Sequence, residues 1–189
     1  MNTFKNIWAK SFQDLAFIDF RTLSLFRICF GIVLFFDLLT KSLDLTAFYT
    51  DRGIFPRSLA LDYLGWWSVS FHMASGAFWF QAVLMAVGFL LSLCFIFGYQ
   101  TRLVTVLLWI FFVSLQGRNH LILHSGDALI RLMLFWSMFL PLDARYSLDR
   151  VLLARIGKEY PGQGVAGLSS LAILLQLLCM YFYTAILKD

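Results

Sequence analysis

The residue best placed to do chemistry is Lys188, which closes the long apolar run of residues 179–187. A lysine at the end of a membrane helix can extend to the polar interface and have no further role. A lysine held partly out of water loses its proton more readily, and the neutral amine can then act as a base. Position alone favours the interfacial role, and the chemical role stays open.

Asp127 and Arg131 are a second pair of charges that could act together. They are four residues apart, and on a helix this spacing places both side chains on one face. Charges inside a membrane segment are expensive, so we expect them to form an ion pair. The pair could orient its helix or belong to a functional site, and the sequence leaves both alternatives open.

Two histidines, His120 and His124, also have a helical i, i+4 spacing that could hold a metal ion. No third ligand is obvious near them in the sequence, so we expect no metal site. Arg27 and Asp37 lie near opposite ends of the first apolar segment. We expect Arg27 to extend to the interface and Asp37 to face a cavity or a partner.

Composition indicates where these residues act. Mean hydropathy is +0.78, 60% of residues are hydrophobic and 14% are charged, which is far from a soluble globular average. We therefore expect a multi-pass protein of the cell membrane, with the lipid bilayer as its surroundings. The net charge of +4 then belongs to loops near lipid headgroups, because the sequence has no basic run or phosphate-binding loop typical of nucleic-acid partners.

The fold class that we predict is all-α, a transmembrane helical bundle with about five spans and an N-terminal interfacial helix. The interfacial helix is expected over Phe4–Phe20, within an N-terminal segment of residues 1–22. The transmembrane domain is expected over residues 23–189. The predicted spans are 23–39, 77–97, 103–115, 128–142 and 168–187.

The distribution of lysine and arginine favours a cytoplasmic N-terminus. With that orientation the inner side carries eight basic residues and the outer side five. The inner set is Lys5, Lys10, Arg21, Arg102, Arg145, Arg150, Arg155 and Lys158; the outer set is Lys41, Arg52, Arg57, Arg118 and Lys188. The loops of residues 44–72 and 116–126 and Lys188 should then lie on one extracytoplasmic face.

Several ordered motifs resemble the horizontally transferred transmembrane (HTTM) domain, which vitamin K-dependent γ-carboxylases share with many bacterial proteins. The resemblance runs from about Leu23 to the last residue. Its motifs are Leu25-Phe26-Arg27-Ile28, Phe48-Tyr49-Thr50-Asp51-Arg52-Gly53-Ile54-Phe55-Pro56-Arg57, Asn119-His120 through Asp127 with Arg131, Pro141 through Asp149, and Gln176, Tyr181-Phe182 and Lys188.

The resemblance implies roles for three residues. Lys188 matches the proposed base that deprotonates reduced vitamin K, and Asn119 and His120 match residues close to that site. A lysine base and a neighbouring imidazole or amide suit an enolate-like or phenolate-like oxyanion. The family domain continues beyond this lysine, so we expect the chain to be its N-terminal part. Carboxylation by this chain alone is therefore not expected.

Two classes of function follow. In the first, a membrane enzyme core holds a quinone-like or lipid substrate at its extracytoplasmic face and uses Lys188 as a base. In the second, a non-catalytic membrane scaffold assists the maturation or export of a small secreted peptide. The sequence identifies no cofactor, and it leaves enzymatic activity itself undecided.

Overall fold

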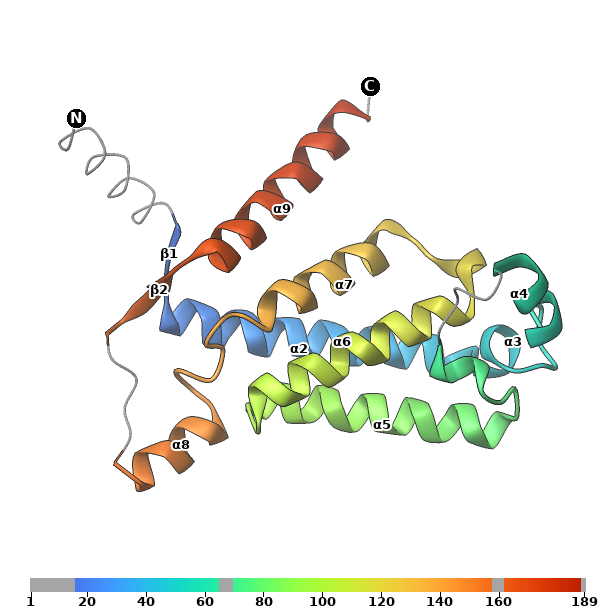
Figure 1. Cartoon of the computed structure of the whole chain (residues 1–189), viewed down its shortest axis with the longest axis horizontal. Coiled ribbons are helices and arrows are strands. Elements are labelled where there is room, and N and C mark those ends of the chain that lie inside the picture. The colour runs from blue at the N-terminus through green and yellow to red at the C-terminus, as the bar shows by residue number, and fades with distance from the viewer. Residues whose placement is uncertain (1–15, 65–69, 158–161, 188–189) are drawn as a thin grey trace.

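The computed structural model describes residues 16–64, 70–157 and 162–187. Within these residues the chain is mostly helical, which confirms the predicted all-α class. Figure 1 shows an elongated helical bundle from which the last helix rises at an angle. The elements are β1 (Phe17–Asp19), α2 (Phe20–Leu43), α3 (Leu45–Tyr49), α4 (Arg57–Leu64), η1 (Phe71–Met73), α5 (Phe78–Phe97), α6 (Thr101–Arg118), η2 (His120–Ile122), α7 (Ser125–Ser137), α8 (Leu148–Arg155), β2 (Gly164–Ala166) and α9 (Leu168–Ile186).

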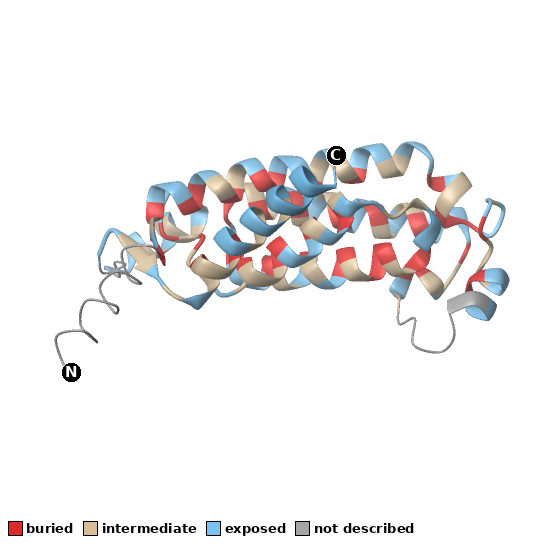
Figure 2. Ribbon diagram, turned by 90° about the horizontal axis from the view of Figure 1, so that it is seen from above, coloured by how far each residue is buried: buried red, intermediate tan, exposed pale blue. Residues whose placement is uncertain are grey.

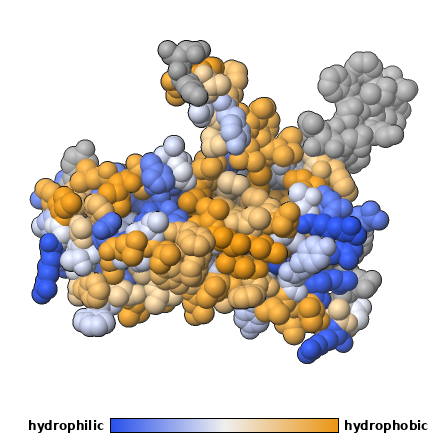
Figure 3. All heavy atoms as spheres, turned by 180° about the vertical axis from the view of Figure 1, so that it is seen from behind, coloured by the Kyte–Doolittle hydropathy of each residue, from blue (hydrophilic) through white to orange (hydrophobic). Residues whose placement is uncertain are grey.

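Four helices, α2, α5, α6 and α9, are long and apolar enough to cross a membrane. They correspond to four of the predicted spans and support the prediction of a membrane protein. In Figure 3 hydrophilic residues gather toward the two ends of the molecule, with a mostly hydrophobic band between them. This distribution is typical of a protein whose middle lies in hydrocarbon and whose ends reach water.

The remaining predicted span, 128–142, is shorter in the structure. Its helix, α7, ends at Ser137 after 13 residues. At 1.5 Å per residue it is about 20 Å long, which is less than a bilayer core. Pro141 explains the early end, because its ring clashes with the carbonyl group four residues earlier and it has no N–H to donate. Residues 138–147 form turns and bends instead.

The predicted interfacial helix over Phe4–Phe20 falls largely outside the described residues. Of its described part, Phe17–Asp19 is not helical and forms strand β1. β1 pairs antiparallel with β2, with Phe17 opposite Ala166 and Asp19 opposite Gly164. The pair fixes the start of α2 beside the start of α9, and the Asp19 carboxylate caps α2 by accepting from the backbone N–H of Arg21 at 2.6 Å.

Helices α2, α5, α6 and α7 pack as sequential neighbours around one apolar core. Figure 2 shows the buried residues along their facing sides. Two glycines allow close approach: Gly31 of α2 contacts Ile96, and Gly88 of α5 contacts Phe111. A β-carbon at either position would lie 2.6 Å from the neighbouring side chain. Small residues at helix contacts are a common means of packing in membranes.

The loops expected on the extracytoplasmic face meet at one end of the bundle, as predicted. Asn119 donates from Nδ2 to the carbonyl oxygen of Phe48 at 3.1 Å, and the Ser70 hydroxyl donates to the carbonyl oxygen of Ser114 at 2.6 Å. We call this the loop end of the bundle. Which side of a membrane it occupies stays a prediction.

The opposite end is organised around Arg27, which does not extend to the interface as expected. Its side chain is fully buried, and Nη2 donates to the carbonyl oxygen of Tyr146 at 2.6 Å. Gly98, with φ of 69°, ends α5 directly against this guanidinium. The carbonyl group of Gly98 accepts from the backbone N–H of Asp149 at 3.0 Å, which ties α8 to the same corner.

Gly98→Ala should destabilise the protein strongly. A β-carbon there would lie 1.8 Å from Nη1 of Arg27, in addition to the cost of a positive φ. Gly157→Ala is the matched control, because Gly157 has φ of 70° and nothing within 4 Å of an added β-carbon. Gly157→Ala should cost about 1–2 kcal/mol for the backbone conformation alone. Thermal unfolding in detergent would compare the two, and equal losses would contradict the packing role of Gly98.

Candidate functional site

The loop end contains a buried group of charges that joins α2 to α7. Nζ of Lys41 lies 2.7 Å from Oδ2 of Asp37 and 2.6 Å from Oδ1 of Asp127. The lysine and Asp37 side chains are 12% and 14% exposed, and that of Asp127 is 2% exposed. Asp37 and Lys41 are one helical turn apart on α2. We refer to Asp37, Lys41 and Asp127, which are buried or half-buried, together with the exposed His124 beside Asp127, as the Lys41 cluster.

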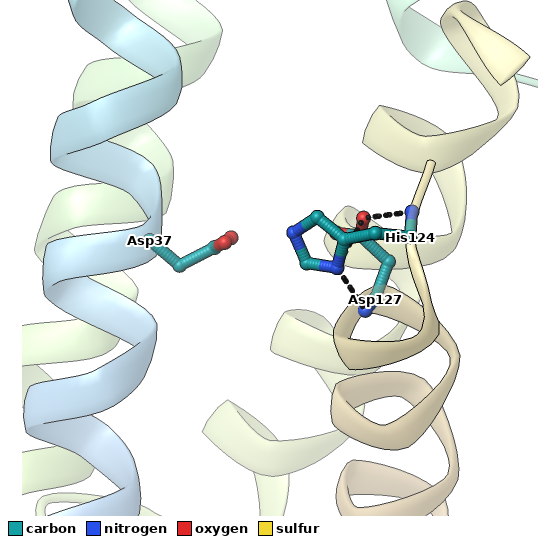
Figure 4. A group of neighbouring side chains, drawn as sticks. All are labelled: Asp37, His124 and Asp127. Atoms are coloured by element: carbon teal, nitrogen blue, oxygen red, sulfur yellow. Dashed lines mark hydrogen bonds and ion pairs between the residues drawn. The ribbon is translucent and has the colours of Figure 1, made fainter. Parts of the chain in front are cut away.

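His124 and Asp127 form a reciprocal cap at the start of α7. The backbone N–H of His124 donates to Oδ2 of Asp127 at 3.0 Å, and the backbone N–H of Asp127 donates to Nδ1 of His124 at 3.3 Å (Figure 4). Gln116 of α6 donates from Nε2 to the carbonyl oxygen of Asp127 at 2.9 Å. A carboxylate in the first turn also interacts favourably with the helix dipole. The start of α7 is therefore fixed by the segment before it through His124, by α6 through Gln116 and by α2 through Lys41.

The protonation of Asp127 follows from these contacts. Burial on its own would raise the pKa of its carboxyl group. The hydrogen bonds from Lys41 and from the backbone of His124, with the positive charge of Lys41, outweigh burial and hold the pKa below its usual range. Asp127 is therefore an ionised acceptor, and two carboxylates face one ammonium in this cluster.

The same residues bear on the question of a metal ion. Ligand atoms of Asp37, His124 and Asp127 lie within 4.8 Å of one another (Figure 4). The neighbours of His124 in this group are thus Asp127, three residues later, and Asp37, on another helix, whereas the sequence suggested His120. Lys41 already donates to both carboxylates, so its ammonium occupies the place that a cation would take. The arrangement fits an ion pair better than a metal centre.

Asp127 is paired with Lys41 instead of the predicted Arg131. Among the described residues, the cation that pairs with Asp127 is Lys41, and Arg131 is exposed. The helical spacing of Asp127 and Arg131 is real, but a tertiary contact with α2 competes for the carboxylate. A buried carboxylate gains more from a partner that is itself buried.

A second charged group at the loop end ties the loop after α3 to α6. Arg57 contacts the Asp51 carboxylate through Nη2 at 2.8 Å and through Nε at 2.9 Å, and Nη2 of the fully buried Arg118 lies 3.7 Å from it. The hydrogen bond from Arg57 lowers the pKa of Asp51. Gly76 packs directly on this carboxylate, where an added β-carbon would lie 2.0 Å from it. Gly76 is therefore required because a side chain at this position would collide with the carboxylate, and not because of its backbone conformation.

His72 is buried in the same region and is held by Gln81 of α5. Nε2 of Gln81 donates to the carbonyl oxygens of His72 and Ser75, so its Oε1 accepts from Nδ1 of His72 at 2.7 Å. This assigns the proton to Nδ1 and leaves Nε2 without a partner among the described residues. Burial lowers the pKa of His72 to about 4, so the ring is neutral at pH 7.

A cavity of about 520 Å³ lies between the start of α7 and the end of α9. Ser125 lines it on the α7 side, directly after His124 in the chain. The α9 side consists of Met180, Tyr183, Thr184 and Leu187. The wall is mostly apolar, and α9 is the least buried of the four long helices. A molecule dissolved in the lipid phase could therefore reach the cavity from the side.

The residues predicted to be catalytic have different environments. Lys188 lies outside the described residues, although Leu187 before it lines the cavity. Asn119 is buried and serves the backbone: it donates to Phe48 and accepts from the N–H of Leu121 at 3.0 Å. His120 is exposed in η2. A pocket shared by Lys188 and His120 stays a prediction.

The sequence did not identify Lys41 as a partner of Asp127, nor did it identify Arg118 and His72 as buried residues. The i, i+4 spacing of Asp37 and Lys41 was the available signal for the first. Asp37 does have the partner that was expected of it. The residues next to His72 and Arg118 in the sequence do not indicate that these side chains are buried, because each side chain is held by residues from other segments of the chain.

No protein-family model, curated protein or solved structure matches this chain.

The Lys41–Asp127 contact should show a large coupling free energy. Lys41→Met alone should cost about 3–5 kcal/mol, because it leaves the carboxylates of Asp37 and Asp127 without their cation. Asp127→Asn should cost less, because Lys41 keeps Asp37 as a partner, and the double variant should cost less than the sum of the two. The matched control is Asp127→Asn with Arg131→Met. Thermal stability in detergent would measure both cycles. Coupling in the Arg131 cycle but not in the Lys41 cycle would contradict the structure.

His72 should make stability depend on pH between about 6.5 and 4. Its folded pKa is lowered, so the neutral ring contributes its full stability above pH 6.5, and this contribution is lost as pH falls toward 4. The loss is of the order of 3 kcal/mol. His72→Gln should flatten the pH dependence of the free energy of unfolding over this range, whereas His120→Gln, at an exposed position, should leave that dependence unchanged. An unaltered slope in His72→Gln would contradict the assignment.

Proposed function

We propose that this chain is the membrane core of a protein that binds a quinone-like or lipid molecule at its loop end, where a lysine acts as a base. The observation that carries the proposal is the cavity between α7 and α9, which Ser125, the residue after His124, lines on the α7 side. Its volume of about 520 Å³ is in the range of small-molecule sites. The resemblance to the HTTM domain supports the same class of ligand.

The lining of the cavity suits a flat amphipathic ring. Met180 and Leu187 offer apolar surface, and Tyr183 and Ser125 offer hydroxyl groups. The hydroxyl of Thr184 already donates to the carbonyl oxygen of Met180 at 2.7 Å. A ligand hydroxyl or carbonyl group would therefore be oriented by Ser125 on the α7 side or by Tyr183 on the α9 side.

We assign the base to Lys188, which follows Leu187 in the chain. Lys41 is unsuited to this role, because its ammonium already donates to two carboxylates. In the proposed step the neutral amine of Lys188 takes the proton of a ligand O–H group. The O–H bond breaks, the oxygen keeps the electron pair, and an ammonium and an oxyanion result.

A scaffold that assists a small secreted peptide is the second candidate. The exposed apolar face of α9 favours it, because an unpacked helix in a membrane can receive a partner segment. Leu174, Leu178, Tyr181 and Phe182 are each at least 42% exposed on this helix. This function requires no base.

Binding of a short-chain naphthoquinone would test the proposal. Met180→Trp fills the cavity and should weaken binding about tenfold or more. Leu178→Trp is the matched control on the same helix, since Leu178 is 64% exposed and does not line the cavity. Calorimetric titration in detergent would measure both. Equal affinities of the two variants, or no binding by the unaltered chain, would overturn the proposal and favour the scaffold.

Lys188→Arg and Lys188→Ala should impair the base equally. A guanidinium group does not lose its proton near neutral pH, so arginine keeps the positive charge but cannot act as a base. The measurement is the absorbance of the quinolate formed from the bound quinol as pH is raised. Both variants should require a higher pH than the unaltered chain. If Lys188→Arg behaved like the unaltered chain, the lysine would have only a positional role.

A further inference from the structure

We propose that α8 is an interfacial helix, which lies in the bilayer surface and binds anionic phospholipids. Its apolar side chains enter the lipid beneath the headgroups, and the arginines beside them contact lipid phosphates. The helix is at the end of the bundle opposite the Lys41 cluster. It is therefore independent of the proposed function, which concerns the loop end.

The depth of α8 is fixed by its contacts with the turn between α5 and α6. The Asp149 carboxylate accepts from the backbone N–H groups of Gln100 and Thr101, each at 2.8 Å. In return, the backbone N–H of Asp149 donates to the carbonyl oxygen of Gly98 at 3.0 Å. Both α5 and α6 are long and apolar enough to cross a membrane, so the turn between them marks a bilayer surface. The first turn of α8 is therefore held at that surface.

Outside the bundle, α8 presents an apolar face that the described residues leave uncovered (Figure 1). None of its eight residues is buried. Leu148, Val151, Leu152 and, directly after the helix, Ile156 are each at least 48% exposed. The spacings i, i+3, i+4 and i+8 place these side chains on one side of the helix. A helix with an uncovered apolar face and flanking basic residues is typical of segments that lie in the membrane interface.

A groove beside Leu152 joins this face to the lipid around the bundle. The groove has a volume of about 390 Å³ and lies between α8 and the start of α6. Leu152 and Leu153 line its α8 side, and Leu103 lines its α6 side. Leu103 is itself 54% exposed, so apolar surface continues from α8 onto a helix that is long and apolar enough to cross the membrane. Acyl chains that cover α6 would therefore cover α8 as well.

The charges around α8 favour anionic lipids. Arg145 before the helix and Arg155 in its last turn are exposed, and neither guanidinium has an ion pair within the part of the chain that the structure describes. The nearby acidic residues are engaged inside the protein: Asp149 serves the start of α6, and the charge of Asp143 acts on the buried Arg27. Arginines close to a bilayer surface are attracted by negative lipid headgroups.

Fluorescence quenching in bilayers of phosphatidylglycerol and phosphatidylcholine in equal amounts tests the proposal. A bimane label is attached to Leu152→Cys or to Ala154→Cys, in a chain whose three native cysteines are replaced by alanine. Ala154 is the matched control, because it is exposed on the other side of α8. The label at position 152 should be quenched by nitroxide lipids and protected from aqueous iodide. The label at position 154 should show the reverse.

The same label measures which lipid lies beside the helix. Nitroxide-labelled phosphatidylglycerol should quench the label at position 152 more strongly than nitroxide-labelled phosphatidylcholine. Arg155→Gln should lower this preference about fivefold, because it removes one cation from the anionic surface. Arg52→Gln is the matched control, since Arg52 is an exposed arginine at the loop end, and it should leave the preference unchanged.

Four results would overturn the proposal. Equal quenching by iodide at positions 152 and 154 would place α8 in water. Protection of position 152 from both quenchers would show that a protein covers the face. Equal quenching by the two nitroxide lipids, or equal preferences in Arg155→Gln and Arg52→Gln, would exclude recognition of anionic lipids by α8. If the cysteine-free chain does not fold, hydrogen exchange of the unaltered chain replaces the label. The α8 amides should then exchange more slowly in phosphatidylglycerol nanodiscs than in phosphatidylcholine nanodiscs, and equal rates would contradict the proposal.

Discussion

The ammonium of Lys41 is the interaction on which the loop end depends. It contacts Asp37 of its own helix at 2.7 Å and Asp127, which lies 86 residues after Lys41 in the chain, at 2.6 Å. Two carboxylates cannot remain ionised and close together in an apolar bundle without such a cation. Because Asp127 also caps α7, the position of that helix relative to α2 is set by this lysine.

The functional proposal depends on that placement. The start of α7 presents Ser125 to the cavity, and the other lining residues belong to the end of α9, the least buried of the long helices. The opposite end has its own fixed corner, where Arg27, Gly98 and Asp149 meet. The bundle has one charged cluster at each end and an apolar middle. The helices are therefore fixed against sliding along their axes as well as against rotation about them.

Hydropathy predicted the long helices, because transmembrane length and apolar content are properties of the local sequence. It overestimated the length of α7, because Pro141 ends the helix although the sequence around it remains apolar. It also ended the first span at Leu39, whereas α2 continues to Leu43. Lys41 was therefore assigned to a loop when it lies one turn after Asp37. That error concealed the partner of Asp127, which only the tertiary contact between α2 and α7 reveals.

Rotational-echo NMR on the protein in lipid bilayers would test the Lys41–Asp127 contact most directly. Lysine Nζ would carry ¹⁵N and aspartate Cγ would carry ¹³C, with the Lys41 signal assigned by its loss in Lys41→Arg. In an Asp37→Asn background, we expect strong dephasing of the Lys41 signal by one remaining carboxylate, that of Asp127. A Lys41 signal without dephasing in that background would show that the lysine does not join the two helices.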